Sequence, residues 1–305
     1  MGRRKKGRKV SGWIILDKPV GVTSTHAVSR VRRMFDAQKA GHAGTLDPLA
    51  SGVLPLALGE ATKTVPYVMD GEKRYLFTVR WGIETSTDDT EGEPVATSDA
   101  RPDEEAILSV LPRFVGTIDQ VPPAFSAKKI DGERAYDLAR DGEVVELEAS
   151  QITIHDLAYL GSPDEDRALF EAHCGKGTYV RAIARDLGRA LGTRGHVTSL
   201  RRTQVGPFDE HGTVTLDQLE AMESPEDCDA LLTPMANALG ELHEIQVVSG
   251  DAAKLRRGMS LLVRGPTAPA NGEEVYAMDG NELIAIGVMD YGKFLPKRVI
   301  VPAEG

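Results

Sequence analysis

The stretch from Gly41 to Ser51 constrains the backbone of this chain tightly. It reads Gly-His-Ala-Gly-Thr-Leu-Asp-Pro-Leu-Ala-Ser, so a single acidic residue, Asp47, stands between glycines and a proline. A residue before proline is disfavoured in helical geometry, whereas glycine allows backbone angles that other residues avoid. The Asp47 carboxylate is therefore held in one direction, as a nucleophile or general base requires. On these residues alone, a turn-forming aspartate is the commoner interpretation.

The residues around this loop favour the catalytic interpretation. The run from Lys39 to Lys63 closely resembles the catalytic signature of the tRNA pseudouridine synthase B (TruB) family. The resemblance continues in further stretches, which are Leu16–Gly21, Lys73–Gly82, Cys174–Arg181 and His196–Arg202. Residues 48–55 read as in bacterial members, rather than as in the archaeal and eukaryotic relatives that work with guide RNA. Ala43 is a departure, because a hydroxyl residue is common there in the family.

This resemblance implies that Asp47 is the single catalytic aspartate and that Arg181 pairs with it. An opposite charge within a few ångströms keeps a carboxylate ionised even in a closed pocket. Without the resemblance, Arg181 reads as a solvated charge on a helix that also carries Arg185. The step performed by Asp47 is either attack on the ribose or removal of a ribose proton to give a glycal, and the sequence leaves both routes open.

Five other residues match family positions around the target nucleotide, namely Lys18, His42, Tyr75, Tyr179 and Leu200. Tyr75 would stack on the uracil, although it also extends the apolar face of a strand. Tyr179 and Leu200 would contact the nucleotide, and His42 would take the place of the extruded base in the RNA stack. Lys18 would buttress the pocket. Taken singly, Leu200 reads as a core residue and His42 as a structural histidine.

The reaction of this family detaches uracil from C1′ of its ribose and reattaches it through carbon, so it needs no cofactor and no metal. The sequence agrees with this. The run Gly175-Lys-Gly177 has Val180 where a dinucleotide loop has its third glycine, and a phosphate loop would need glycine in place of Phe170. His173 and Cys174 lack the second Cys/His pair that a four-ligand zinc site requires.

The composition is that of an ordinary soluble globular protein. The chain has 305 residues, of which 41% are hydrophobic and 27% charged, enough for one sizeable core and a small second domain. No stretch approaches the roughly 18–20 apolar residues of a membrane helix, and no apolar core follows the basic N-terminus as in a signal peptide. Cys174 and Cys228 suggest no disulfide framework. We therefore expect a cytoplasmic monomer that does not bind membranes.

Charge is distributed unevenly along the chain. Residues 1–10 carry six cations and no acid, which is a charge of +6. Because the net charge of the whole chain is −10, the remaining residues sum to −16. Acids dominate residues 84–105 and 217–229, whereas cations recur near the motifs. A surface segregated in this way can bind RNA on one side. We expect a partner RNA and not DNA, and a disordered basic arm at 1–10 that either binds phosphates or aids solubility.

The pattern of elements indicates an α+β fold with a central, mainly antiparallel mixed sheet flanked by helices. A strand at 12–17 precedes a helix that starts near Ser24, with Ser24 or Thr25 as its cap. Residues 73–81 alternate strictly, which predicts a half-buried strand. Further strands are predicted at 53–58, 167–174 and 196–205. Further helices are predicted at 60–69, at 103–112, from Gly177 to about Leu191, and at 251–257.

Two domains follow from this pattern. We expect residues 11–240 to form the catalytic domain. Within it, residues from about 116 to 150 read as an RNA-gripping insertion that leans off the main sheet. This insertion carries Lys128 and Lys129 and a short helix that ends at Gly142. Residues 241–305 are small and β-rich, with a hairpin turn at 279–281, and the resemblance suggests a PUA-like RNA-binding module.

The resemblance implies that the chain converts the uridine at position 55, in the TΨC loop of the tRNA T-arm, to pseudouridine. Recognition would be chiefly of loop shape and splayed bases. Two alternatives stay open: a pseudouridine synthase with another RNA target, and an RNA chaperone that refolds tRNA without depending on turnover. The presence of Asp47, Tyr75 and Arg181 together argues against a purely binding protein.

Overall fold

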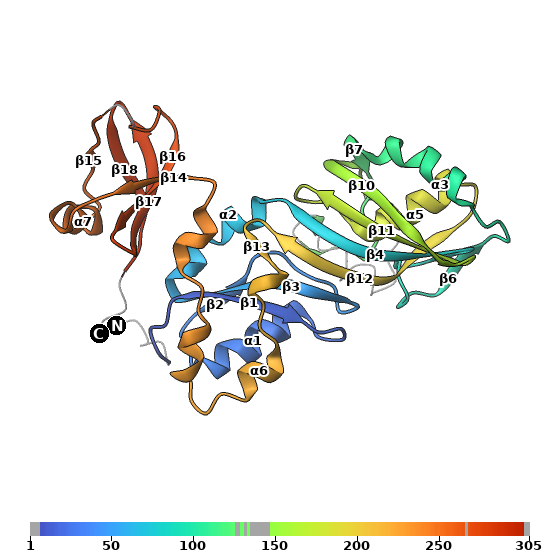
Figure 1. Ribbon diagram of the computed structural model, residues 1–305, viewed down its shortest axis with the longest axis horizontal. Coiled ribbons are helices and arrows are strands. Elements are labelled where there is room, and N and C mark those ends of the chain that lie inside the picture. Colours follow the sequence, from blue (N-terminus) through green and yellow to red (C-terminus); the bar gives the residue numbers. More distant parts are fainter. Residues whose placement is uncertain (1–6, 126–128, 131–132, 135–146, 266–267, 302–305) are drawn as a thin grey trace.

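The computed structural model describes residues 7–125, 129–130, 133–134, 147–265 and 268–301. Two separate β-sheets organise these residues, a large one with helices around it and a small one near the C-terminus (Figure 1). This is the α+β fold with a β-rich C-terminal part that the sequence predicts. Within the described ranges, no helix combines the length and the apolar character needed to cross a bilayer.

Nine strands form the large sheet in the order β1-β3-β12-β4-β11-β10-β7, with β2 paired to β3 and β13 to β12. The strands β3 and β12 run parallel, and the other pairs in this sheet are antiparallel. The bounds are β1 (Gly12–Lys18), β2 (Ala40–His42), β3 (Ala50–Leu58), β4 (Lys73–Trp81), β7 (Gly116–Gln120), β10 (Ser150–Asp164), β11 (Arg167–Cys174), β12 (Gly195–Val205) and β13 (Phe208–Asp209).

Helices pack at both ends of this sheet (Figure 1). They are α1 (Ser24–Met34), α2 (Val65–Asp70), α3 (Glu104–Val110), α5 (Val180–Ala190) and α6 (Leu216–Glu220). Short 3-10 turns stand at Gly59–Lys63, Leu111–Phe114, Glu210–Gly212, Asp227–Leu231 and Met235–Leu239. Two small ribbons pair β5 (Ile83–Thr85) with β6 (Pro94–Thr97), and β8 (Lys129–Ile130) with β9 (Glu133–Arg134). Helix α5 lies against β12 and β4, which places its N-terminus beside the first residues of β4.

The strict alternation at 73–81 is confirmed as strand β4, with one buried face. Its apolar side chains, Tyr75, Phe77, Val79 and Trp81, are all at most 9% exposed. Phe170 of β11 packs on this face, with its ring centroid 5.4 Å from that of Phe77 and 6.2 Å from that of Trp81. This core makes β4 a rigid support for Tyr75, which is the third residue of the strand.

The small sheet has the order β14-β16-β17-β18-β15, and β14 and β16 run parallel. Its strands are β14 (His243–Gln246), β15 (Leu261–Leu262), β16 (Glu274–Asp279), β17 (Glu282–Asp290) and β18 (Lys293–Val299), with α7 (Ser249–Arg256) beside them. The hairpin predicted at 279–281 joins β16 to β17. Tyr67 of α2 meets this part of the chain, because the guanidinium of Arg298 lies 5.9 Å from its ring centroid.

Two details differ from the sequence-based expectation, and a third lies outside the described residues. Thr23 caps α1 by accepting from the backbone N–H of His26, and Ser24 instead bonds to the distant Leu46. Residues 116–120 do not leave the main sheet but form its edge strand β7, because the long strand β10 supplies a partner that local sequence cannot reveal. Lys128 and the helix predicted to end at Gly142 lie outside the described residues, and the gripping role of 116–150 stays a prediction.

The predicted arm at 1–10 is described from Gly7 onward. Arg8 bonds to Asp229, with Nη2 2.5 Å from Oδ2, and its Nε lies 3.2 Å from Glu226. Its backbone N–H donates to the carbonyl of Asp36. This end of the predicted arm is therefore attached to the body of the protein.

Candidate active site

Asp47 lines a cavity of about 450 Å³ that is formed by the loop before β3, the end of α2, β4, the start of α5 and β12. Five residues expected from the sequence lie together there: Asp47, Tyr75, Tyr179, Arg181 and Leu200. The other lining residues are Gly44, Thr45, Leu46, Met69, Asp70, Lys73, Gly175, Lys176, Gly177, Thr178, Val180 and Arg202. The cavity is in the size range of ligand pockets, and its wall mixes apolar and charged side chains.

Hydrogen bonds from the β1–α1 segment hold the Asp47 loop in place. The hydroxyl of Ser24 donates to the carbonyl of Leu46 and accepts from the Leu46 N–H, at 3.0 and 2.8 Å. On the other side of Asp47, the Gly21 N–H donates to the carbonyl of Pro48 at 2.7 Å. The backbone is thus fastened immediately before and after the carboxylate, which fixes its direction as the sequence predicts.

The predicted pairing of Arg181 with Asp47 is present in the structure. Nε of Arg181 lies 2.9 Å from Oδ2 of Asp47, and the arginine side chain is 7% exposed whereas that of Asp47 is 36% exposed. The carboxylate therefore has one oxygen held by a buried cation and a surface still open to the cavity.

Arg181 is itself held by partners from two other segments. Its Nη1 donates to the carbonyl of Thr87 at 2.9 Å and lies 3.3 Å from Oδ2 of Asp89. Its Nη2 donates to the carbonyl of Phe125 at 2.9 Å. Asp89 comes from the acidic loop that composition alone assigns to solvent, yet its side chain is only 2% exposed. The sequence-based prediction missed this residue.

Arg202 forms the floor of the cavity beneath Tyr75. Arg202 lies opposite Tyr75 in the pairing of β12 with β4, and its guanidinium donates to the carbonyls of Val53, Thr45 and Gly44 at 2.9, 3.3 and 3.1 Å. Burial raises the pKa of Tyr75, and the nearby Arg202 opposes that rise. The phenol is thus protonated at neutral pH. Arg202 belongs to a recognised motif, but no local pattern marks it as part of the site.

Tyr179 and Leu200 reach the cavity from the start of α5 and from β12. Gln120 of β7 bonds to both backbone groups of Tyr179: its Nε2 donates to the carbonyl at 3.1 Å and its Oε1 accepts from the N–H at 2.9 Å. Leu200 lies between Ala50 of β3 and Phe77 of β4 and is 6% exposed. Both interpretations of Leu200, as core and as pocket wall, therefore apply.

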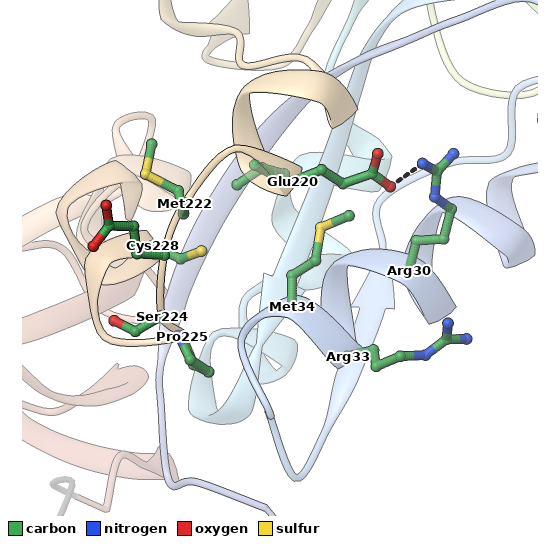
Figure 2. Close-up of a pocket in the computed structure, with 10 residues that line it drawn as sticks. Arg30, Arg33, Met34, Glu220, Met222, Ser224, Pro225 and Cys228 are labelled. Atoms are coloured by element: carbon green, nitrogen blue, oxygen red, sulfur yellow. Dashed lines mark hydrogen bonds and ion pairs between the residues drawn. The ribbon is translucent and has the colours of Figure 1, made fainter.

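A second hollow of about 340 Å³ lies between α1 and the segment 219–228, away from Asp47 (Figure 2). Arg30 and Glu220 form an ion pair at its edge, and Met34, Met222 and Cys228 line it. None of the site residues predicted from the sequence contributes to it.

The comparisons with known proteins agree with this geometry. The TruB family pseudouridylate synthase N-terminal domain matches residues 32–180, and the tRNA pseudouridylate synthase B C-terminal domain matches residues 181–240. The tRNA pseudouridine synthase B of Bradyrhizobium diazoefficiens is 58% identical over 97% of this chain and 87% of its own length. That of Agrobacterium fabrum is 56% identical over 97% of this chain and 96% of its own. The chain belongs to the TruB family.

Solved structures support the same fold. A chain of the archaeal box H/ACA sRNP Nop10–Cbf5 complex is 26% identical and has a TM-score of 0.71, over 100% of this chain and 94% of its own. A chain of a Cbf5–Nop10–Gar1 complex is also 26% identical with a TM-score of 0.71, over 96% of this chain and 85% of its own. The higher identity to bacterial proteins confirms the bacterial form expected from residues 48–55.

Two residues that the TruB resemblance brings to the site do not line its cavity. Lys18 is fully buried below the Asp47 loop, where its Nζ donates to the carbonyls of Pro19 and Val22 at 2.9 and 2.7 Å. Burial lowers its pKa to about 8, although the charge of Asp47 opposes this shift. His42 lies on β2, opposite Leu56 of β3. Lys18 thus supports the loop from one side, and its Nζ also lies 3.5 Å from the carbonyl of Pro48, whereas His42 lies on the strand that precedes the loop.

The described part of the TruB chain offers no cluster of three or more His, Cys, Asp or Glu side chains that could hold a metal ion. What the cavity does offer is the Asp47 carboxylate paired with a buried arginine, a second carboxylate at Asp70, the buried Arg202, aromatic rings and an aliphatic wall. Such a set can hold a planar base and present an anion to its sugar.

Proposed function

We propose that this pseudouridine synthase isomerises the uridine at position 55 in the TΨC loop of tRNA. The observation that carries the proposal is the Asp47 carboxylate, which is paired with Arg181 at 2.9 Å and still open to a cavity large enough for a nucleotide. The relatives named tRNA pseudouridine synthase B, at 56–58% identity over nearly the whole chain, support tRNA as the substrate.

Asp47 is the proposed catalytic group. Attack on the ribose and removal of a ribose proton both require an ionised oxygen that can reach the sugar. Arg181 pairs with the carboxylate, and the loop bonds at Leu46 and Pro48 keep it aimed. Because the guanidinium is already bonded to Thr87 and Phe125, it stays in place while the carboxylate reacts.

Tyr75, Tyr179 and Leu200 are the proposed walls for the extruded base. A base in a folded RNA must leave its stack before chemistry at its glycosidic bond can occur. An aromatic face for stacking, worth about 1–3 kcal/mol per base, helps to offset that cost. We propose that His42 fills the place that the base leaves, and that Lys18 supports the loop.

The RNA partner would approach from the side of Lys73 and Lys176, which line the same cavity. Lys176 is 67% exposed in its side chain and so can reach a phosphate, although it is 3.0 Å from Asp70 in the free protein. The T-arm is the proposed part of the tRNA. We propose a monomer in a reducing cytoplasm, where the buried Cys174 and Cys228 stay free thiols.

The test is the substitution Asp47→Asn with Asp70→Asn as a matched control. Asp70 also lines the cavity, but its side chain is 64% exposed and lies on α2. Asp47→Asn should bind a T-arm stem-loop normally and form no detectable pseudouridine, whereas Asp70→Asn should turn over. Residual turnover by purified Asp47→Asn would remove Asp47 from the mechanism.

Mapping pseudouridines in cells with and without the gene would test the substrate. Loss at tRNA position 55 is expected, and loss only in another RNA would contradict the proposal. Cells that carry Asp47→Asn separate the isomerisation of uridine from a role in tRNA folding. If they lack pseudouridine but keep normally folded tRNA, a chaperone role exists beside the isomerisation.

A further inference from the structure

Gln120 is a buried glutamine that connects the edge strand β7 to the start of α5. It is 3% exposed, and its side chain bonds to both backbone groups of Tyr179, which lies 59 positions further along the chain. Nε2 donates to the carbonyl at 3.1 Å, and Oε1 accepts from the N–H at 2.9 Å. A primary amide carries both a donor and an acceptor, so it can satisfy the two partners at once. Gln120 therefore holds the backbone of Tyr179 as a neighbouring strand would.

The start of α5 lacks the local cap that fixes α1, α3 and α6. In those helices Thr23, Asp103 and Thr215 accept from a backbone N–H of the first turn. Tyr179 stands at the corresponding position of α5, and its side chain makes no capping bond within the described residues. It lines the cavity instead. Serine, threonine or aspartate there would cap the helix but would leave the cavity without this aromatic wall, which explains why the fixing bonds come from Gln120.

The segment that follows Gln120 is fastened to the same helix. Nη2 of Arg181 donates to the carbonyl of Phe125 at 2.9 Å. About one turn further along α5, Nη2 of Arg185 donates to the carbonyl of Val121 at 2.8 Å. In both contacts a side chain of the helix holds the backbone of the segment. At Gln120 the relation is reversed, because there a side chain of the segment holds the backbone at the start of the helix. Gln120 is thus the contact that places the first residues of α5.

The start of α5 carries two residues of the cavity. Tyr179 lines it, and Arg181 follows two positions later, with its Nε 2.9 Å from Oδ2 of Asp47. A shift of the backbone at this point would therefore move the wall for the base and the partner of the carboxylate together. A displacement of about 1 Å can cost about a hundredfold in rate. Gln120 itself does not line the cavity that the described residues form, so its influence on the reaction passes through these two side chains.

We propose that Gln120 is a positioning residue for the isomerisation, which fixes the start of α5 so that Tyr179 faces the extruded base while Arg181 meets Asp47. The inference rests on the proposed function, since it takes the cavity as the place where base and sugar react. Loss of the amide should slow the reaction more than it weakens RNA binding, because the alignment of the reacting groups depends on these bonds and the wider contact with tRNA does not.

The first experiment compares Gln120→Met with the matched control Gln204→Met by single-turnover rate and tRNA affinity. Methionine keeps the approximate length of glutamine but has no strong hydrogen-bonding group. Gln204 of β12 also bonds to a backbone carbonyl, that of Gly206 at 3.0 Å, but it does not line the cavity. Gln120→Met should slow pseudouridine formation about tenfold to a hundredfold, with affinity within about twofold, and Gln204→Met should have the wild-type rate. A wild-type rate for folded Gln120→Met, or equal slowing by both variants, would overturn the inference.

A second readout holds even if Gln120→Met does not fold. In Gln120→Glu the protonated carboxyl offers a donor and an acceptor as the amide does, whereas the ionised carboxylate only accepts and loses the bond to the Tyr179 carbonyl. Its rate, divided by the wild-type rate at the same pH, should therefore rise about fivefold or more from about pH 8 to about pH 6, because burial favours the neutral carboxyl. A ratio that does not change with pH would contradict the inference. A wild-type enzyme that forms no pseudouridine at position 55 of ordinary tRNA would instead refute the proposed function.

Discussion

Arg181 bridges Asp47 and Asp89, with its Nε 2.9 Å from one carboxylate and its Nη1 3.3 Å from the other. The two acids differ in surroundings, since the Asp47 side chain is 36% exposed and that of Asp89 is 2% exposed. Asp89 also accepts from the Thr87 hydroxyl and from the Glu91 N–H, so it is itself held firmly. Asp89 therefore fixes the arginine that orients the Asp47 carboxylate.

Replacing Asp89 by Asn tests this bridge. The amide keeps the size of the side chain but removes a buried charge, so Arg181 should hold Asp47 less rigidly. We expect the single-turnover rate to fall about tenfold to a hundredfold, with tRNA affinity nearly unchanged.

Asp88→Asn is the matched control for this prediction. Asp88 pairs with Arg185 at 3.0 Å rather than with Arg181. Its loss should change the melting temperature more than the rate. Equal rate losses in the two variants at equal stability would show that Asp89 acts only through the fold of the loop.

The sequence predicts the strand and the motif residues that form the site better than it predicts the buried hydrogen bonds and ion pairs between them. The alternation at 73–81 identifies β4, and family motifs identify Asp47 and Arg181, because both signals are local. Asp89 lies in an acidic, Gly- and Pro-containing loop, whose composition favours solvent exposure. Ser24 has the residue type of a cap, but its partner Leu46 lies 22 positions away. Contacts of this kind depend on the packing of distant segments, which no local pattern encodes.

Lys18 gives the stability of the protein a specific pH dependence. Its pKa falls from the usual 10.5 to about 8 on burial. Below pH 8 it is protonated in folded and unfolded chains alike, so it adds no slope. Between about pH 8 and 10.5 the folded chain has released a proton that the unfolded chain keeps, so the free energy of unfolding rises with pH through this group.

Lys18→Met should remove that contribution, which is at most about 1.4 kcal/mol per pH unit. Urea unfolding of both proteins between pH 7 and 10 measures it. Lys73, whose pKa is also lowered to about 8 by burial, is present in both proteins, so the difference isolates Lys18. Parallel pH profiles of wild type and variant would show that Lys18 does not titrate in this range.

The basic N-terminus can be divided by experiment into two parts. Arg8 has partners in Asp229 and Glu226, whereas residues 1–6 contain Arg3, Arg4, Lys5 and Lys6. If residues 1–6 bind phosphates, their deletion should weaken tRNA binding and reduce its salt dependence. The slope should fall by about 0.7–0.9 log units for each phosphate that is no longer bound. Arg8→Ala should lower stability and leave the salt slope unchanged, and an unaltered slope after the deletion would assign residues 1–6 to solubility.

Tyr75 allows stacking to be separated from core packing. It is 9% exposed on the buried face of β4, yet it also lines the cavity. Tyr75→Phe keeps the ring and removes the hydroxyl, and Tyr75→Leu keeps apolar bulk and removes the ring. If the ring stacks on the base, Tyr75→Leu should weaken binding of the extruded base by about 1–3 kcal/mol relative to Tyr75→Phe. If the two variants have equal melting temperatures, Tyr75→Leu should react roughly fivefold to hundredfold more slowly than Tyr75→Phe.

The hydroxyl makes a separate contribution in the same experiment. The phenol belongs to a residue that lines the cavity, and a hydroxyl can hydrogen-bond to the base, so Tyr75→Phe should bind tRNA normally and still form pseudouridine slowly. A tyrosine that served only as core would give folded Phe and Leu variants with the wild-type rate. In that case Tyr179 and Leu200 would be left as the walls that hold the base.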